Sequence, residues 1–130
     1  MSQMLVVSKI DVVTRQLVAA IGLYANEGDP IAIHTLAAAA YNVMRDINAA
    51  RSGTPMLIKD RAIESVRPER RNEVRTRINS AENFFKHADR DQDDRLRFHP
   101  EQSEFMLFDL CNTLRDHVTD EPPLCAAFRI

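Results

Sequence analysis

Apolar residues recur along this chain of 130 residues at intervals of three and four, the spacing of one buried face of an α-helix. The first such run follows Ser8 and Asp11, an S-x-x-D capping box that starts helices, and ends at a polar break from Asn26 to Gly28. Its apolar positions are Val13, Leu17, Ala20, Ile21 and Tyr24. The pattern predicts a first helix between the capping box and the break.

The next two predicted helices each begin with a polar residue followed by proline. Asp29-Pro30 combines an N-cap residue with proline at the first helical position, and the segment after it continues without a helix breaker to Ser52-Gly53. Thr54-Pro55 repeats this start signal. We therefore expect a long second helix, followed by a shorter third helix that ends at about Val66.

A fourth predicted helix starts at Pro68 and combines an apolar face with a basic one. Its apolar positions follow i, i+4 and i+7 spacing: Val74, Ile78, Ala81, Phe85 and Ala88. Five arginines lie on its other faces, against only two glutamates, and no aromatic residue that would stack on a base lies among them. These candidate RNA- or phosphate-binding residues are Arg67, Arg70, Arg71, Arg75 and Arg77. The alternative interpretation is a solvated helix face.

A fifth predicted helix starts at His99-Pro100 and continues as PEQSEFMLFDLCNTLRDHV until Pro122-Pro123 stops it. Its segment FMLFDLC is apolar nearly all round, so we expect this helix at the centre of a bundle or shared with a second subunit. The last residues, LCAAFRI, are too apolar for a free tail. We expect them to fold back over the bundle or to reach into a neighbouring subunit.

Composition agrees with an all-helical fold in one domain spanning residues 1–130. The chain has only three glycines, which is few for a β-rich protein full of turns, and it contains no repeat or linker. These patterns together predict an all-α, single-domain antiparallel bundle of about five helices. The net charge of −2 argues against a nucleic-acid footprint that covers the whole protein. No segment is apolar enough to span a membrane, and the start resembles no secretory signal, so we expect a cytoplasmic protein with reduced thiols at Cys111 and Cys125.

The stretch HADRDQDDRLRFHPE resembles the calcium loop of an EF-hand. Its candidate metal ligands are Asp89, Asp91, Asp93 and Glu101. Counted from the first aspartate, the sixth position is Asp94 instead of the usual glycine, and the twelfth is Pro100 instead of a bidentate glutamate. The alternatives are a solvated acidic turn, a non-standard metal site and a true calcium site. No other cofactor is predicted.

The second predicted helix carries a polar line beside its alanine run at residues 37–40. His34, Tyr41 and Arg45 recur there at i, i+7 and i+11, and we expect Asp109 and Glu104 of the fifth helix to face them. The candidate ligand-binding residues are therefore His34, Tyr41, Arg45, Glu104 and Asp109. The alternative is a hydrogen-bonded histidine with a buried Arg-Asp pair that holds the helices in register. A di-metal carboxylate site is disfavoured because the chain has no Glu-x-x-His pair.

Two resemblances accompany these patterns. The segments SKIDVVTRQL, DPIAIHTLAAAAYNVMRDI, NFFKHADRD and HPEQSEFMLFD, over about residues 8–110, resemble a family of small bacterial all-helical proteins that has no assigned activity. The phrase AIHTLAAAAYNVMRD resembles HEPN-type helical bundles, many of which cleave RNA. Their catalytic motif, an arginine followed by four to six residues and then a histidine, is missing here, so the second resemblance implies the bundle architecture alone.

Three functions remain open from the sequence. The leading hypothesis is a non-catalytic cytoplasmic interaction module that self-associates, as a dimer, through the fifth helix and the LCAAFRI segment. The second is a ligand- or metal-binding bundle, perhaps an enzyme, that uses the His34 line. The third is RNA or phosphate binding by the Arg67–Arg77 face. Nothing resembling a Gly-rich phosphate loop, a G-x-S-x-G elbow or an HExxH motif supports a catalytic function.

Overall fold

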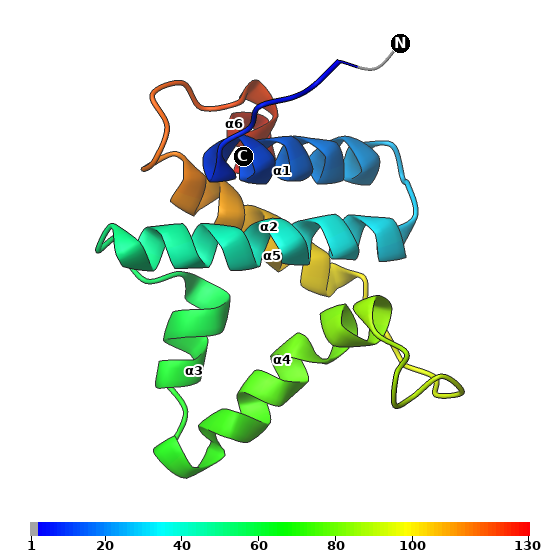
Figure 1. The fold of residues 1–130 in the computed structure, drawn as a ribbon. Helices are drawn as coiled ribbons and strands as arrows, with labels where there is room; N and C mark the ends of the chain where they lie inside the picture. Colours follow the sequence, from blue (N-terminus) through cyan, green and yellow to red (C-terminus); the bar gives the residue numbers. More distant parts are fainter. Residues whose placement is uncertain (1–2) are drawn as a thin grey trace.

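The computed structural model describes residues 3–130, and its regular elements are all helical (Figure 1). These elements are α1 (Lys9–Ala25), α2 (Pro30–Ala50), the π-helix η1 (Leu57–Arg61), α3 (Ala62–Glu64), the 3₁₀ helix η2 (Pro68–Arg70), α4 (Arg71–Lys86), α5 (Glu101–Leu114) and α6 (Pro123–Phe128). No strand occurs within the described residues. The predicted all-α class is confirmed.

Helices α1, α2, α5 and α6 enclose the apolar core. In Figure 1, α1 and α2 run antiparallel side by side, α5 crosses behind them, and α3 and α4 project from the opposite side of α2. The core is built mainly from buried side chains of these four helices and includes Leu17, Ala37, Met44, Leu107, Leu110 and Cys125. Five residues of α5 belong to this core, which confirms its predicted central position. No residue between 57 and 86 is a buried member of this core, and the buried Ile63 and Ala81 lie apart from it.

The predicted starts of α1 and α2 are confirmed by their caps. The Ser8 hydroxyl accepts a hydrogen bond from the Asp11 backbone N–H (3.0 Å), and the Asp11 carboxylate accepts one from the Ser8 N–H (3.0 Å). Asp29 accepts from the N–H groups of Ile31 (2.8 Å) and Ala32 (3.2 Å). Each cap uses backbone donors that have no partner within the helix, which is why the local sequence alone locates these two starts.

The chain end folds back over its own bundle, which is one of the two alternatives predicted for the LCAAFRI segment. Helix α6 packs against α1 and α5, where Cys125 is buried and Phe128 contacts the ring of Tyr24 edge to face at 5.6 Å. The thiols of Cys111 and Cys125 are free and hydrogen-bonded to each other, and this contact together with burial raises the pKa of Cys111. The prediction that Pro122-Pro123 stops the fifth helix is wrong. Helix α5 ends at Leu114, and Pro123 is instead the first residue of α6.

Two other sequence predictions need correction. The third helix does not start at Thr54-Pro55 but at Leu57, as a π-helix whose N-terminus is capped by distant side chains. The predicted apolar face of the fourth helix is only partly buried, because α4 contacts α2 and α3 at the edge of the molecule. Ala81 is buried there, but Ala88 is exposed beyond the end of the helix.

Within residues 3–130, the structure contains no helix with the length and apolar character needed to cross a membrane.

Candidate functional site

The five residues predicted to share one cavity lie in four separate environments. Tyr41 and Asp109 contact each other in the core, His34 lies nearer the start of α2, and Glu104 is exposed and accepts a hydrogen bond from Tyr24 (2.9 Å). The predicted Arg45–Asp109 pair does not form, because Arg45 donates to Asp60 instead (2.7 Å). The structure therefore divides the predicted site.

Tyr41 and Asp109 together cap the N-terminus of η1. The Asp109 carboxylate accepts hydrogen bonds from the backbone N–H groups of Leu57 (3.0 Å) and Ile58 (3.1 Å), and from the Tyr41 hydroxyl (2.5 Å). The Tyr41 oxygen also accepts from the N–H groups of Ile58 and Lys59, both at 3.2 Å. These are the first donors of a helix, which have no partner within it. Burial and the hydrogen bond to Asp109 raise the pKa of Tyr41, so its hydroxyl stays protonated.

Asp60 provides a second cap at the same turn. Its carboxylate accepts a hydrogen bond from the Met56 backbone N–H (3.1 Å) and from the Arg45 guanidinium, which is half exposed. Arg45 of α2 therefore holds the start of η1 through its contact with Asp60. Tyr41 and Arg45 are one turn apart on α2, and both hold the same short helix in place.

His34 is buried in an aromatic environment and keeps one ring nitrogen without a partner. Its side chain is 1% exposed, with Nδ1 hydrogen-bonded to the Ser103 hydroxyl (3.0 Å) and the ring packed edge to face on Phe85 and Phe98. The buried Nε2 has no hydrogen-bond partner among the described residues. Burial lowers the pKa of His34, the Glu82 charge acts against this shift, and the Lys59 charge adds to it.

An apolar pocket of about 350 Å³ adjoins His34. It lies between α4 and α5, with Ile58 of η1 also on its wall. The other lining residues are Arg77, Ile78, Gln102, Phe105 and Met106. A concave, mostly apolar surface with a few polar groups is the usual form of a binding site, and His34 is the group here whose hydrogen bonding is incomplete.

A buried ion pair, which the sequence analysis missed, lies on another side of α4. Lys59 and Glu82 are 5% and 3% exposed and contact each other. Asn42 of α2 bonds to both, accepting from Lys59 Nζ (2.7 Å) and donating to Glu82 Oε2 (2.6 Å). Burial lowers the pKa of Lys59, an effect that Glu82 opposes. One signal was available in the sequence: Glu82 follows Ile78 by four residues and so falls on the predicted apolar face of the helix.

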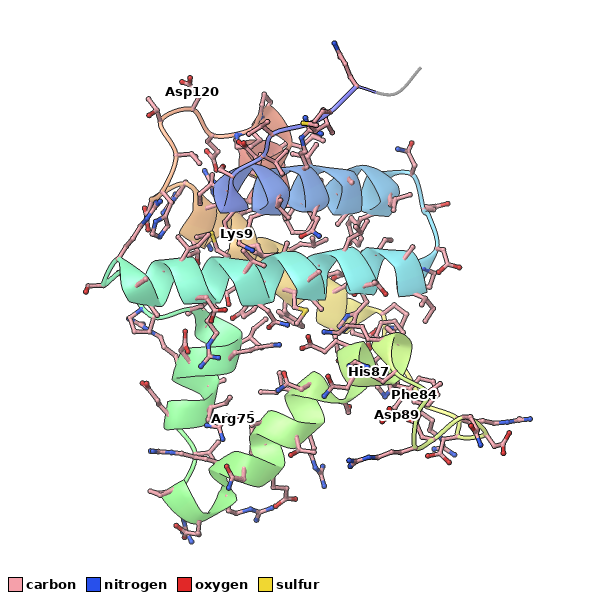
Figure 2. All side chains as sticks on the ribbon, viewed as in Figure 1. Lys9, Arg75, Phe84, His87, Asp89 and Asp120 are labelled. Carbon is pink, nitrogen blue, oxygen red and sulfur yellow. The ribbon has the colours of Figure 1, made fainter. Side chains whose placement is uncertain are left out.

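The acidic segment forms an exposed turn. It extends away from the helices, and Figure 2 labels Asp89 at its start. Asp94 donates its backbone N–H to the Asp91 carbonyl (2.8 Å), and the Arg90 and Asp89 side chains lie 3.9 Å apart while both stay exposed. Among residues 3–130, no three His, Cys, Asp or Glu side chains are grouped as a metal site would require, Asp93 and Glu101 included. The sequence predicts no cofactor here, and calcium binding stays one of the alternatives that it leaves open.

The five arginines of the predicted basic face are not equivalent. Arg71 donates to the carbonyls of Val66 (3.1 Å) and Glu64 (3.0 Å), and so holds the end of α3. Glu73 pairs with both Arg70 (3.2 Å) and Arg77 (3.4 Å). Arg67 is exposed, whereas Arg75 and Arg77 line two different pockets.

No protein-family model, curated protein or solved structure matches this chain. The two resemblances described from the sequence therefore stay predictions.

The Asp109 cap generates the first prediction. Asp109→Ala leaves the Leu57 N–H and the Tyr41 hydroxyl without an acceptor, each at about 1 to 3 kcal/mol, and removes one of the two acceptors of the Ile58 N–H, so we expect a loss of roughly 2 to 5 kcal/mol in the free energy of unfolding. Urea denaturation measures it. The control is Asp46→Ala, on the exposed side of α2, which should change stability by less than about 0.5 kcal/mol. Equal effects of the two substitutions would contradict the cap.

The buried ion pair generates the second prediction. Lys59→Met leaves the Glu82 carboxylate buried without its main partner, and we expect a loss of about 3 to 5 kcal/mol. The double variant Lys59→Met/Glu82→Leu removes both charges and should recover most of this loss. A double-mutant cycle by urea denaturation measures the coupling. Additive effects of the two single substitutions would mean that the pair is not coupled.

His34 generates a prediction for pH. Its pKa in the folded protein lies below the ordinary 6.5, so just below pH 6.5 the unfolded chain binds a proton that the folded chain does not. Stability should therefore fall as the pH decreases through this window, by up to about 1.4 kcal/mol per pH unit. His34→Gln should remove this component, whereas His99→Gln, at an exposed position, should retain it. Identical pH profiles for the two variants would refute the assignment to His34.

Proposed function

We propose that this protein is a non-catalytic interaction module that forms a homodimer through the face of α5 beside the His34 pocket. The observation that carries the proposal is the position of Phe105. This side chain is 66% exposed on the central helix of the fold and also lines the apolar pocket. An exposed aromatic ring beside an apolar hollow is unfavourable in water and favours association.

The apolar surface continues beyond this one ring. Phe108, one turn along α5, is 40% exposed, and Leu57 is 45% exposed. Leu57 belongs to the same region because its backbone N–H bonds to Asp109, one turn after Phe105. Aromatic residues are enriched at the centres of protein interfaces, where they carry much of the binding energy.

The arrangement suits a second copy of the same chain. A two-fold symmetric interface brings the same patch of both subunits together, so the patch must be complementary to itself. Phe105 supplies a projecting ring, and the adjacent pocket supplies a hollow of about 350 Å³. In a symmetric dimer the ring of each subunit would enter the pocket of the other.

Two further observations support a cytoplasmic binding protein over an enzyme. The buried groups able to act as acids or bases, among them Tyr41, Lys59, Glu82 and Asp109, all bond to neighbours within the fold. Their contacts serve to position η1 and α4. The thiols of Cys111 and Cys125 lie together without forming a disulfide, which is the expected state in a reducing compartment.

A small ligand in the same pocket is the second candidate. The specific observation in its favour is the unpartnered Nε2 of His34, since a buried polar nitrogen gains a hydrogen bond when a polar group of a ligand reaches it. This proposal places the interface on α5 and not on the LCAAFRI segment, because α6 packs against α1 and α5.

Sedimentation velocity over a wide concentration range tests the dimer. We expect reversible association for the native chain, and a dissociation constant at least about tenfold weaker for Phe105→Ser, equivalent to about 1.4 kcal/mol. Leu124→Ser, which removes an exposed apolar residue of α6, should leave association unchanged. A strict monomer at all concentrations would refute the dimer, and an effect of Leu124→Ser without one of Phe105→Ser would place the interface on the tail instead.

A further inference from the structure

A small polar pocket of about 160 Å³ lies between α2, η1 and α4, and most of its charged side chains are cationic. Arg45, Lys59, Arg75 and Lys86 line it, together with the single carboxylate of Glu82. The dimer proposal does not use this pocket. It also lies on a different side of α4 from the apolar pocket, which takes Arg77 and Ile78 from that helix.

Helical spacing explains how the pocket forms. Arg75, Asn79, Glu82 and Lys86 recur at i, i+4, i+7 and i+11, so one face of α4 carries all four. This face is opposed by Arg45 of α2 and by Lys59 of η1. Figure 2 shows Arg75 on the side of α4 that faces α3. Three helical segments therefore bring their cationic side chains to one place.

The carboxylates of the site do not balance its positive charges. Asp60 neutralises Arg45 at 2.7 Å, and Glu82 is shared between Lys59 and Lys86, the latter at 3.6 Å. Arg75 donates to Asn72 on its own helix (2.8 Å) and forms no ion pair with the described part of the chain. Two positive charges thus remain in excess. Like charges held this close repel one another, and a bound anion would relieve the repulsion.

Several hydrogen-bond donors at the site are also unused. An ammonium group has three N–H donors, and Lys59 uses two of them, on Glu82 and Asn42. Arg45 bonds to Asp60 through Nε, and its terminal nitrogens have no hydrogen-bond partner within residues 3–130. Asn79 Oδ1 is buried without a partner, and rotation of this amide places its NH₂ donors at the same position.

We propose that this pocket binds a phosphate group, either free or as the end of a phosphomonoester. Arginine and lysine side chains from different segments, aimed at one small volume, match the several oxygens of a tetrahedral dianion. A volume of about 160 Å³ is sufficient for a phosphate group. Binding joins α2, η1 and α4 through one ion.

Isothermal titration calorimetry with inorganic phosphate tests the site, at constant ionic strength set with sodium chloride. We expect saturable binding and a higher thermal midpoint in phosphate than in chloride, because an ion that binds only the folded chain stabilises it. Arg75→Gln should weaken binding at least tenfold. This substitution removes no ion pair, so the variant should retain its fold, which urea denaturation checks.

Arg67→Gln is the matched control, because it removes the same charge from an exposed position outside the pocket. Lys86→Gln provides a second test from the other end of the site and should weaken binding as Arg75→Gln does. Equal losses for Arg67→Gln and Arg75→Gln would overturn the proposal in favour of diffuse electrostatic attraction, and so would equal thermal midpoints in phosphate and chloride. Glycerol 3-phosphate separates the two sources: tighter binding than that of inorganic phosphate would assign the natural ligand as an ester.

Discussion

The carboxylate of Asp109 connects two parts of the molecule that would otherwise have little in common. Its helix lies in the apolar core, whereas the groups it binds begin the segment of residues 57–86, which contains η1, α3, η2 and α4. No buried residue of that segment belongs to the main core cluster, and its own buried apolar residues, Ile63 and Ala81, lie apart from it. The segment is held by directional contacts: the η1 cap, the Arg45–Asp60 pair and the Lys59–Glu82 pair. Both candidate sites depend on this attachment, because α4 forms a wall of each.

The sequence predicts the helices whose start signals are local. Ser8 and Asp11 lie within one turn of each other, and Asp29 directly precedes Pro30, so each cap is contained in a few residues. The start of η1 could not be predicted in this way. Its cap comes from Tyr41 and Asp109, which lie 16 residues before Leu57 and 52 residues after it. Residues so far apart in the sequence come together only in the folded chain. The local start signal at Thr54-Pro55 therefore predicted the wrong start for this helix.

The sequence predicts that the candidate residues lie on α2 and α5, but not which of them lie together in the fold. His34, Tyr41 and Arg45 do lie along α2 as expected, yet consecutive turns of a helix face different neighbours. His34 meets α5 near its start, Tyr41 meets Asp109 in the middle, and Arg45 meets Asp60 of η1. One line on one helix therefore contributes to three environments. Lys59 and Glu82 went unrecognised because charged residues are rarely buried, and a pair becomes visible only when both partners are placed together.

A buried ion pair contributes little net stability, since desolvation of its charges offsets most of their attraction. Its value here is geometric: apolar contacts would let α4 slide or rotate against α2, whereas Asn42, Lys59 and Glu82 fix one register.

Helix α4 lines both the apolar and the cationic pocket, so binding of the two proposed occupants would be coupled thermodynamically. Arg77 and Ile78 face one pocket, and Arg75 and Lys86 face the other. A ligand that binds one pocket only when α4 is packed against α2 stabilises this position of the helix. A ligand of the second pocket that needs the same position then binds more tightly. By linkage, the effect is equal in both directions. One helix held by a few polar contacts would then link two surfaces of a 130-residue chain.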